Sequence, residues 1–295
     1  MGDVVAIRGD RLSAEINPLG AELWALRDGD GRDLLWGGDP AFWTGRAPIL
    51  FPVIGCVNGG VIRVAGETYP MAKHGFARRR TFTVVEREAA SATFRLEADD
   101  ETRASYPFEF RLDVRFAIEG GALAVTATAH NLGDTPMPAS FGFHPALRWP
   151  LPWGGARAEH RIRFDRPEPE PIRRIDSDGL VRPAPEPSPI EDDTLRLRDD
   201  LFSDDAVILD RPASRGLVYG APGAPALRVE FPDMPELGLW TKPGAGYLCI
   251  EPWAGIADPA GFDGDIFDKP GIVAIPARAA HRFTLRIATD GQALR

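Results

Sequence analysis

The residues best suited to chemistry lie in segment 249–255, which reads Cys-Ile-Glu-Pro-Trp-Ala-Gly. An apolar, strand-like run leads there into Glu251, and Pro252 is expected to end the strand. A carboxylate at the end of a buried strand is partly desolvated, which raises its pKa and makes it a usable general base. Trp253 offers a flat apolar face of the kind on which the C–H side of a sugar ring packs.

Two histidines lie far upstream in similar settings. His74 stands in Lys-His-Gly-Phe-Ala-Arg, and His144 stands in Phe-Gly-Phe-His-Pro. A glutamate base, a histidine acid and aromatic walls together indicate proton transfer on a carbohydrate. Each residue also has a structural interpretation: Glu251 as a surface carboxylate paired with an arginine, His144 as a core histidine, and His74 as a loop residue. Three further histidines have no motif around them and receive no role: His130, His160 and His281.

The elements that must position these residues are predicted to be strands. The chain has 31 glycines and 28 prolines, scattered so that they divide it into many short segments. Alternation of apolar and polar residues predicts half-buried strands over residues 81–86, 92–97, 110–116, 122–129 and 281–287.

Turn and loop signals complete the pattern. Gly120-Gly121 is expected to form a hairpin turn, as is the Asn-Gly-Gly run at 58–60 before a strand at 61–64. Residues 199–205 predict one short helical turn, and the proline-rich segment 167–189 an irregular surface loop. We therefore predict an all-β antiparallel sandwich with few short helices, forming a single domain over residues 1–295.

Composition excludes several classes of function. The chain has 295 residues, of which 44% are apolar and 26% charged, with a net charge of −9. It shows no dense basic stripe and no apolar run of about 20 residues, so neither a nucleic acid nor a membrane is expected as a partner. The first residues lack a signal peptide pattern, which predicts a cytoplasmic protein. Cys56 and Cys249 are expected to be buried free thiols in a reducing compartment.

Six motifs carry a resemblance to a known family. They occur in order over nearly the whole chain, at residues 47–55, 74–78, 140–145, 201–206, 238–243 and 250–258. In these motifs the chain resembles the aldose 1-epimerases, or mutarotases, of the galactose mutarotase-like class, and especially a bacterial aldose-epimerase-like subgroup. The resemblance implies an antiparallel β-supersandwich with a sugar cleft on its concave face, acting on a small-molecule sugar as a monomer or homodimer.

The resemblance also implies roles for individual residues. Glu251 is expected to be the general base that takes the proton of the C1 hydroxyl, and His144 the general acid that protonates the ring oxygen. His74 is expected to donate a hydrogen bond beside the ring. Asp205 is expected to hold substrate hydroxyls, although the adjacent Asp204 is an equal rival for that position.

Other residues extend the expected substrate site. Trp240 and Trp253 are candidate sugar-packing aromatics, and Arg78 could bridge hydroxyls or hold a carboxylate. The family usually has an arginine directly after the glycine of the Phe-Pro-x-x-Gly motif, whereas this chain has Cys56. A thiol cannot supply the forked, charged donors of a guanidinium. Either Arg46 or Arg78 replaces that contact, or the contact is missing.

The expected reaction follows from the chemistry of a cyclic hemiacetal. The ring opens when the anomeric hydroxyl loses a proton while the ring oxygen gains one, so one base and one acid must flank that region. The reaction needs no metal, nucleotide or redox cofactor. None is expected, because the sequence shows neither a glycine-rich phosphate loop nor a cysteine–histidine metal cluster.

Three alternatives remain open at this stage. A hexose 6-phosphate mutarotase would need an arginine cluster, for which the run at 78–80 is a candidate. A non-catalytic carbohydrate-binding or sensor protein would not need both Glu251 and His144. A glycoside hydrolase would pair Glu251 with Asp205, leaving His144 without a task.

Overall fold

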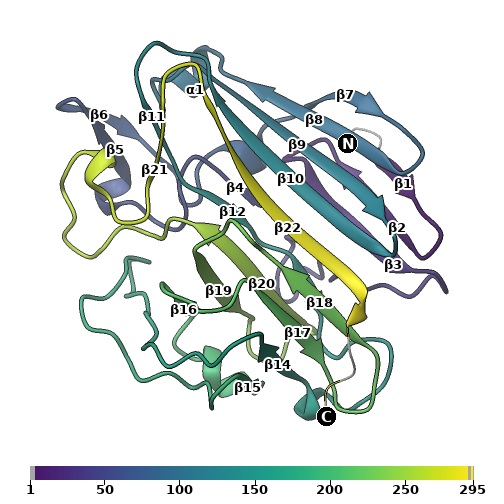
Figure 1. The fold of residues 1–295 in the computed structure, drawn as a ribbon. Coiled ribbons are helices and arrows are strands. Elements are labelled where there is room, and N and C mark those ends of the chain that lie inside the picture. The colour runs from purple at the N-terminus through teal and green to yellow at the C-terminus, as the bar shows by residue number, and fades with distance from the viewer. Residues whose placement is uncertain (1–3, 292–293, 295) are drawn as a thin grey trace.

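The computed structural model describes residues 4–291 and 294, and most of its regular secondary structure is antiparallel sheet (Figure 1). The larger sheet has nine strands. In spatial order these are β15 (Thr194–Arg196), β14 (Arg161–Phe164), β17 (Gly216–Gly220), β18 (Ala226–Glu230), β22 (Ala280–Gly291), β10 (Ala122–Asn131), β9 (Phe110–Glu119), β8 (Ser91–Glu97) and β7 (Thr83–Arg87).

The second sheet carries most of the chemistry predicted from the sequence. Its strands, in order, are β16 (Val207–Leu209), β19 (Glu236–Trp240), β20 (Tyr247–Ala254), β12 (Phe141–Phe143) and β4 (Ile49–Leu50), with β13 (Ala146–Arg148) also paired to β20. The smaller sheets comprise β1 (Val5–Arg8), β2 (Leu12–Asn17) and β3 (Glu22–Asp28); β5 (Val61–Val64) and β6 (Glu67–Pro70); and β11 (Met137–Ala139) and β21 (Val273–Ile275).

Helical structure is short, as expected. It consists of α1 (Asp100–Arg103) and the 3₁₀ turns η1 (Asn58–Gly60), η2 (Ala77–Arg79), η3 (Arg157–Glu159), η4 (Asp199–Phe202) and η5 (Ile266–Asp268). The sequence did not single out α1, which a capping box between Asp99 and Thr102 holds at its start. None of the helices among residues 4–291 is long and apolar enough to span a membrane.

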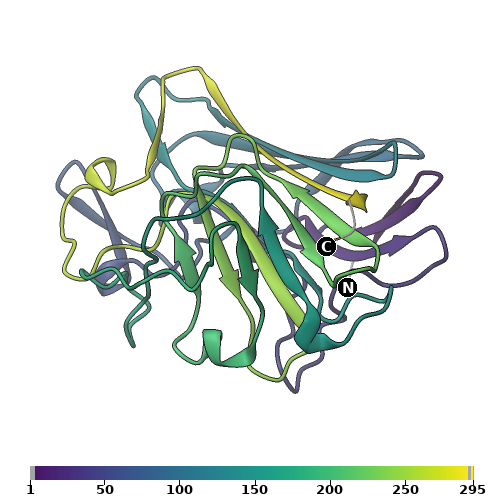
Figure 2. The ribbon, with the colours of Figure 1, turned by 60° about the horizontal axis from the view of Figure 1, so that its bottom comes forward.

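The main core lies between the two large sheets. Figure 2 shows the long strands β9, β10 and β22 running above the green strands β19 and β20. Phe141 of β12 stacks on Phe283 of β22 with ring centroids 4.8 Å apart, and one apolar cluster contains residues of both sheets. Burial of this apolar surface fixes which face of β20 turns inward, so the alternate residues of β20 face the other way.

The five strands predicted from alternation are confirmed as β7, β8, β9, β10 and β22. Gly120-Gly121 does form the hairpin turn between β9 and β10, and both glycines have positive φ. The hairpin predicted at 58–60 is wrong, because that run forms η1 and the actual hairpin joins β5 to β6 across Ala65-Gly66. A hairpin needs a strand on each side, and the residues just before η1 are irregular.

The prediction that Pro252 ends its strand is also wrong, because β20 continues to Ala254. Pro252 faces Leu237 of β19 on one side, and on the other side the ladder is interrupted between β12 and β13. Ile250 directs its N–H to the Pro145 carbonyl in that interruption. Alternate residues of a strand direct their N–H groups to the same side, so the N–H that Pro252 lacks would face the interruption.

The remaining expectations concern the proline-rich segment and the cysteines. Residues 167–189 contain isolated bridges but no strand or helix, so the irregular loop is confirmed. Both cysteines are free, as predicted. Cys249 is fully buried, whereas Cys56 is partly exposed and corrects the expectation of two buried thiols.

Candidate active site

Glu251 and Trp253 lie side by side on the face of β20 that turns away from the main core. Trp253 occupies this surface because glycines lie beside it on both neighbouring strands. A Cβ atom at Gly238 would lie 2.4 Å from the Trp253 ring, and one at Gly142 would lie 2.7 Å from it. The sequence therefore provides a flat aromatic surface next to the carboxylate of Glu251.

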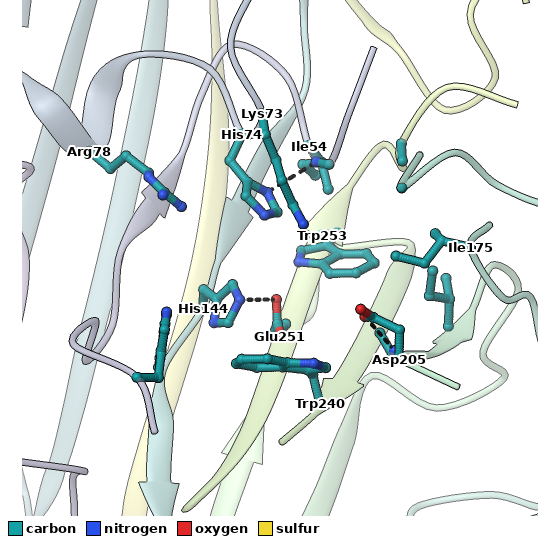
Figure 3. Close-up of a pocket in the computed structure, with 16 residues that line it drawn as sticks. Ile54, Lys73, His74, Arg78, His144, Ile175, Asp205, Trp240, Glu251 and Trp253 are labelled. Atoms are coloured by element: carbon teal, nitrogen blue, oxygen red, sulfur yellow. Dashed lines mark hydrogen bonds and ion pairs between the residues drawn. The ribbon is translucent and has the colours of Figure 1, made fainter. Parts of the chain in front are cut away.

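His144 reaches Glu251 from the interruption between β12 and β13. Its Nε2 atom lies 3.1 Å from Oε2 of Glu251 (Figure 3). Both side chains are almost completely buried, with 7% of His144 and 2% of Glu251 exposed. A candidate acid and a candidate base, separated by about 107 residues in the sequence, are thus in direct contact.

Burial controls the protonation of this pair. It raises the pKa of Glu251 well above its usual range, and the negative charge of Asp205 raises it further. Burial lowers the pKa of His144 to about 3, with smaller contributions from Arg78 and Lys73. Both shifts disfavour charge, so from about pH 3 up to the raised pKa of Glu251 the pair holds one exchangeable proton.

His74 stands beside this pair, with its ring centroid 6.1 Å from that of His144. The backbone N–H of Gly55 donates to Nδ1 of His74 at 3.0 Å, and the backbone N–H of His74 donates to the Gly55 carbonyl at 2.8 Å. Burial lowers the pKa of His74 well below its usual value. Because a backbone N–H can only donate, Nδ1 carries no proton, and a neutral His74 is a donor at Nε2.

Asp205 lines the opposite side of the cleft, and Asp204 does not. The carboxylate of Asp204 is bound by Arg182 at 2.7 and 2.8 Å. The backbone of Asp205 has a positive φ of 60°. The buried guanidinium of Arg174, from the irregular segment, donates to the carbonyls of Leu201, Asp205 and Ala206 at 2.9 to 3.1 Å. Arg174 therefore fixes the turn that presents Asp205.

Two cationic side chains, Lys73 and Arg78, line the cleft near the histidines (Figure 3). Neither has an ion pair or a side-chain hydrogen bond within residues 4–291. Both charges act on His144, whose pKa they lower. This side of the cleft is therefore positively charged, whereas Asp205 makes the opposite side negative.

Aromatic rings form the remaining wall. Trp240 of β19 lies 5.9 Å from His144 between ring centroids, and Trp43 lies 5.0 Å from it. Trp43 and Trp240 contact each other edge to face at 5.5 Å. Together with Trp253 they surround the acid–base pair with apolar surface, which suits the C–H faces of a sugar ring.

The cleft between these walls has a volume of about 230 Å³. Its other lining residues are Ile54, Gly55, Ile175, Gly179, Ala206, Ile208 and Ala257. Ile175 and Gly179 belong to the proline-rich segment, which therefore contributes one rim. Cys56 does not line the cleft. It lies against Gly179, where an added Cβ atom would come within 2.8 Å of the Cys56 Sγ atom.

All seven residues predicted for catalysis and substrate binding line this one cleft: Glu251, His144, His74, Asp205, Arg78, Trp240 and Trp253. Sequence reasoning missed Trp43 and Lys73. Lys73 directly precedes His74, so its place in that motif was an available signal. Trp43 belongs to no motif. It ends a turn in which its N–H donates to the Asp39 carbonyl, and its ring lies over Gly45, where a Cβ atom would come within 2.4 Å of it.

Comparison with known proteins gives a consistent result. The family model for aldose 1-epimerase matches residues 3–271. The protein LacX, chromosomal, of Lactococcus lactis subsp. lactis is 30% identical over 281 residues, which cover 92% of this chain and 94% of that protein.

Solved structures have the same fold. A galactose mutarotase-like protein from Lactobacillus casei ATCC 334 superimposes with a TM-score of 0.89 at 30% identity, covering 97% of this chain and 99% of that one. A galactose mutarotase related enzyme from Lactobacillus acidophilus gives 0.87 at 26% identity, covering 99% and 100%. The expected galactose mutarotase-like fold is thereby confirmed.

Proposed function

Because this chain belongs to the aldose 1-epimerase family, we propose that it interconverts the α and β anomers of a free aldose by acid–base catalysis. Family and fold support a sugar epimerase of the isomerase class. The observation that carries the finer proposal is the 3.1 Å contact between Nε2 of His144 and Oε2 of Glu251 in an aromatic cleft. Acid and base are then close enough to act on adjacent oxygens of one sugar.

Ring opening uses the ionised arrangement of the pair, which forms when the proton of Glu251 moves to His144. The Glu251 carboxylate takes the proton of the C1 hydroxyl, and protonated His144 gives its proton to the ring oxygen. The C1–O5 bond breaks, and the products are an aldehyde, a neutral carboxyl and a neutral imidazole. Concerted transfer avoids both a free alkoxide and a free oxocarbenium ion, and each such group contributes about 10²–10⁴-fold to the rate.

Ring closure regenerates the catalyst. After rotation about C1–C2, the aldehyde presents its other face to the C5 hydroxyl. His144 takes the hydroxyl proton while Glu251 returns a proton to the carbonyl oxygen, giving the other anomer. The two arrangements of the pair contain the same number of protons, so no proton is exchanged with solvent during a turnover.

The other polar groups would orient the sugar. His74, as a donor at Nε2, fits a ring-side hydroxyl, and Asp205 on the opposite wall fits a pair of hydroxyl donors. Trp240 and Trp253 would pack on the C–H faces of the ring. The apolar walls also exclude water, which strengthens the hydrogen bonds to the reacting oxygens.

A hexose 6-phosphate is the second candidate substrate, and the unpaired charges of Lys73 and Arg78 favour it. Both lie on the same side as His144, the group assigned to the ring oxygen, and the C6 substituent of a hexopyranose is attached next to that oxygen. A phosphate would find two cations there. A non-catalytic sugar-binding protein is less favoured, because simple binding gives no reason to bury an acid–base pair.

Polarimetry tests the proposal directly. Freshly dissolved α-D-glucose, α-D-galactose and α-D-glucose 6-phosphate are followed with and without protein, alongside Glu251→Gln. We expect faster approach to the anomeric equilibrium, and loss of that acceleration in the variant, which cannot accept a proton. No acceleration on any of the three sugars, or full activity in the variant, would refute the proposal. Release of reducing sugar from a disaccharide would indicate a glycoside hydrolase instead.

A further inference from the structure

A third side chain with metal-binding chemistry lies next to the acid–base pair. Cys249 precedes Glu251 by two residues on β20, so both side chains project from the same face of that strand. One ligand atom each of His144, Cys249 and Glu251 lies within 4.8 Å of the other two. The mechanism proposed above gives Cys249 no task.

We propose that His144, Cys249 and Glu251 form a binding site for a thiophilic divalent cation such as Zn²⁺ or Cd²⁺, and that occupation of this site inhibits the enzyme. The site would be a regulatory or inhibitory one, because the cation takes the two groups that catalysis needs free. A nitrogen, a sulfur and an oxygen ligand with one open position match the ligand set and coordination number that zinc accepts.

The geometry requires only small movements. Three atoms that lie within 4.8 Å of each other share a centre no more than about 2.8 Å from each. Zinc binds nitrogen and oxygen at about 2.0–2.2 Å and sulfur at about 2.3 Å. Side-chain shifts of up to about 0.8 Å therefore bring all three ligands to bonding distance.

The charges of the three ligands also fit. A Cys249 thiolate and a Glu251 carboxylate carry two negative charges, which neutralise a divalent cation, while His144 binds as a neutral imidazole. The occupied site is then uncharged, as a buried site requires. Binding releases the thiol proton and the proton shared by His144 and Glu251, so affinity rises with pH.

Neighbouring charges have opposing effects on the cation. Lys73 and Arg78 repel it at one wall of the cleft, whereas Asp205 attracts it at the other. Nδ1 of His144 is buried and has no hydrogen-bond partner within the described chain, so a movement of the ring breaks no hydrogen bond at that atom. Hard cations such as Mg²⁺ lack affinity for thiolate and serve as the control.

The experiment measures Cd²⁺ binding on the full chain, independently of activity. Cys56→Ser removes the other cysteine, so in this background the ultraviolet band of a cadmium thiolate reports Cys249 alone. We expect the band to saturate at an equimolar amount of Cd²⁺ and to vanish in Cys56→Ser/Cys249→Ser. Adding His144→Asn or Glu251→Gln should weaken binding by more than the roughly 10–100-fold that loss of an outer-shell partner costs.

Activity supplies the second readout. Cd²⁺ and Zn²⁺ should stop catalysed mutarotation in wild type and in Cys56→Ser, EDTA should restore it, and Cys249→Ser should resist inhibition. A band that does not saturate, or an affinity unchanged by His144→Asn and Glu251→Gln, would overturn the site. If no sugar is turned over, the proposed function fails, while the binding data still decide whether the cation site exists. Binding without inhibition would overturn the inhibitory role.

Discussion

The His144–Glu251 pair leads to a prediction about stability and pH, tested by Glu251→Gln. Burial lowers the pKa of His144 from 6.5 to about 3 and raises that of Glu251 well above 4.5. The folded pair therefore holds one proton from about pH 3 up to the raised pKa of Glu251. Glutamine keeps the size of the protonated carboxyl but does not titrate, so the variant isolates the contribution of His144.

The wild-type pair should add no pH dependence between pH 4.5 and 6.5. In that window the unfolded chain has a charged His144 and an ionised Glu251, so it also holds one proton. Above pH 6.5 the unfolded pair loses this proton, and the free energy of unfolding falls as pH rises. Below pH 4.5 the unfolded pair binds a second proton, and the free energy of unfolding falls as pH drops toward 3.

Glu251→Gln should behave differently within the same window. Only the unfolded variant binds a proton at His144 between pH 6.5 and about 3, so its free energy of unfolding falls as pH drops. Integrating this dependence from pH 6.5 to 4.5, we expect the variant to lose about 2 kcal/mol more of its free energy of unfolding than the wild type does. Urea unfolding at the two pH values, in EDTA to exclude metals, measures this difference. Equal losses in the two proteins would refute the shared proton.

Three further predictions concern activity and packing. His144→Asn should lower kcat by about 10²–10⁴-fold, because asparagine cannot deliver a proton to the ring oxygen. Gly238→Ala should cost about 1–3 kcal/mol of stability and raise KM, because its Cβ atom would lie 2.4 Å from Trp253 and force the indole to tilt. Arg174→Met should raise KM by about tenfold, the equivalent of one hydrogen bond to a charged group, because the turn carrying Asp205 loses its support.

Matched controls separate these effects from general destabilisation. Arg173 adjoins Arg174 but binds Asp210, so Arg173→Met should leave KM unchanged. Gly223 has a positive φ, and an added Cβ atom there would have no neighbour within 4 Å. Gly223→Ala therefore strains the backbone at a site away from the cleft, and should leave KM unchanged. Retained kcat in His144→Asn would show that another group protonates the ring oxygen, and an unchanged KM in Arg174→Met would remove its positioning role.

Local patterns predicted the elements whose signal is contained in a few adjacent residues. Alternation gave β9 and β10, and the intervening Gly120-Gly121 gave their turn, because strand burial repeats every second residue. The same local reasoning failed at Pro252. Whether a proline ends a strand depends on what its missing N–H would have faced. At Pro252 that side of β20 is the interruption between β12 and β13, which only the tertiary structure creates.

The sequence by itself determined the all-β class, the candidate acid and base, and, through its resemblance to a family, the expected cleft. Only the tertiary structure decided which residues meet there. Asp205 lines the cleft, whereas the carboxylate of Asp204 is bound by Arg182. Trp43 and Lys73 also line the cleft. The tertiary structure also set the protonation of the Glu251 pair, because desolvation depends on neighbours far apart in the chain, and no local pattern encodes them.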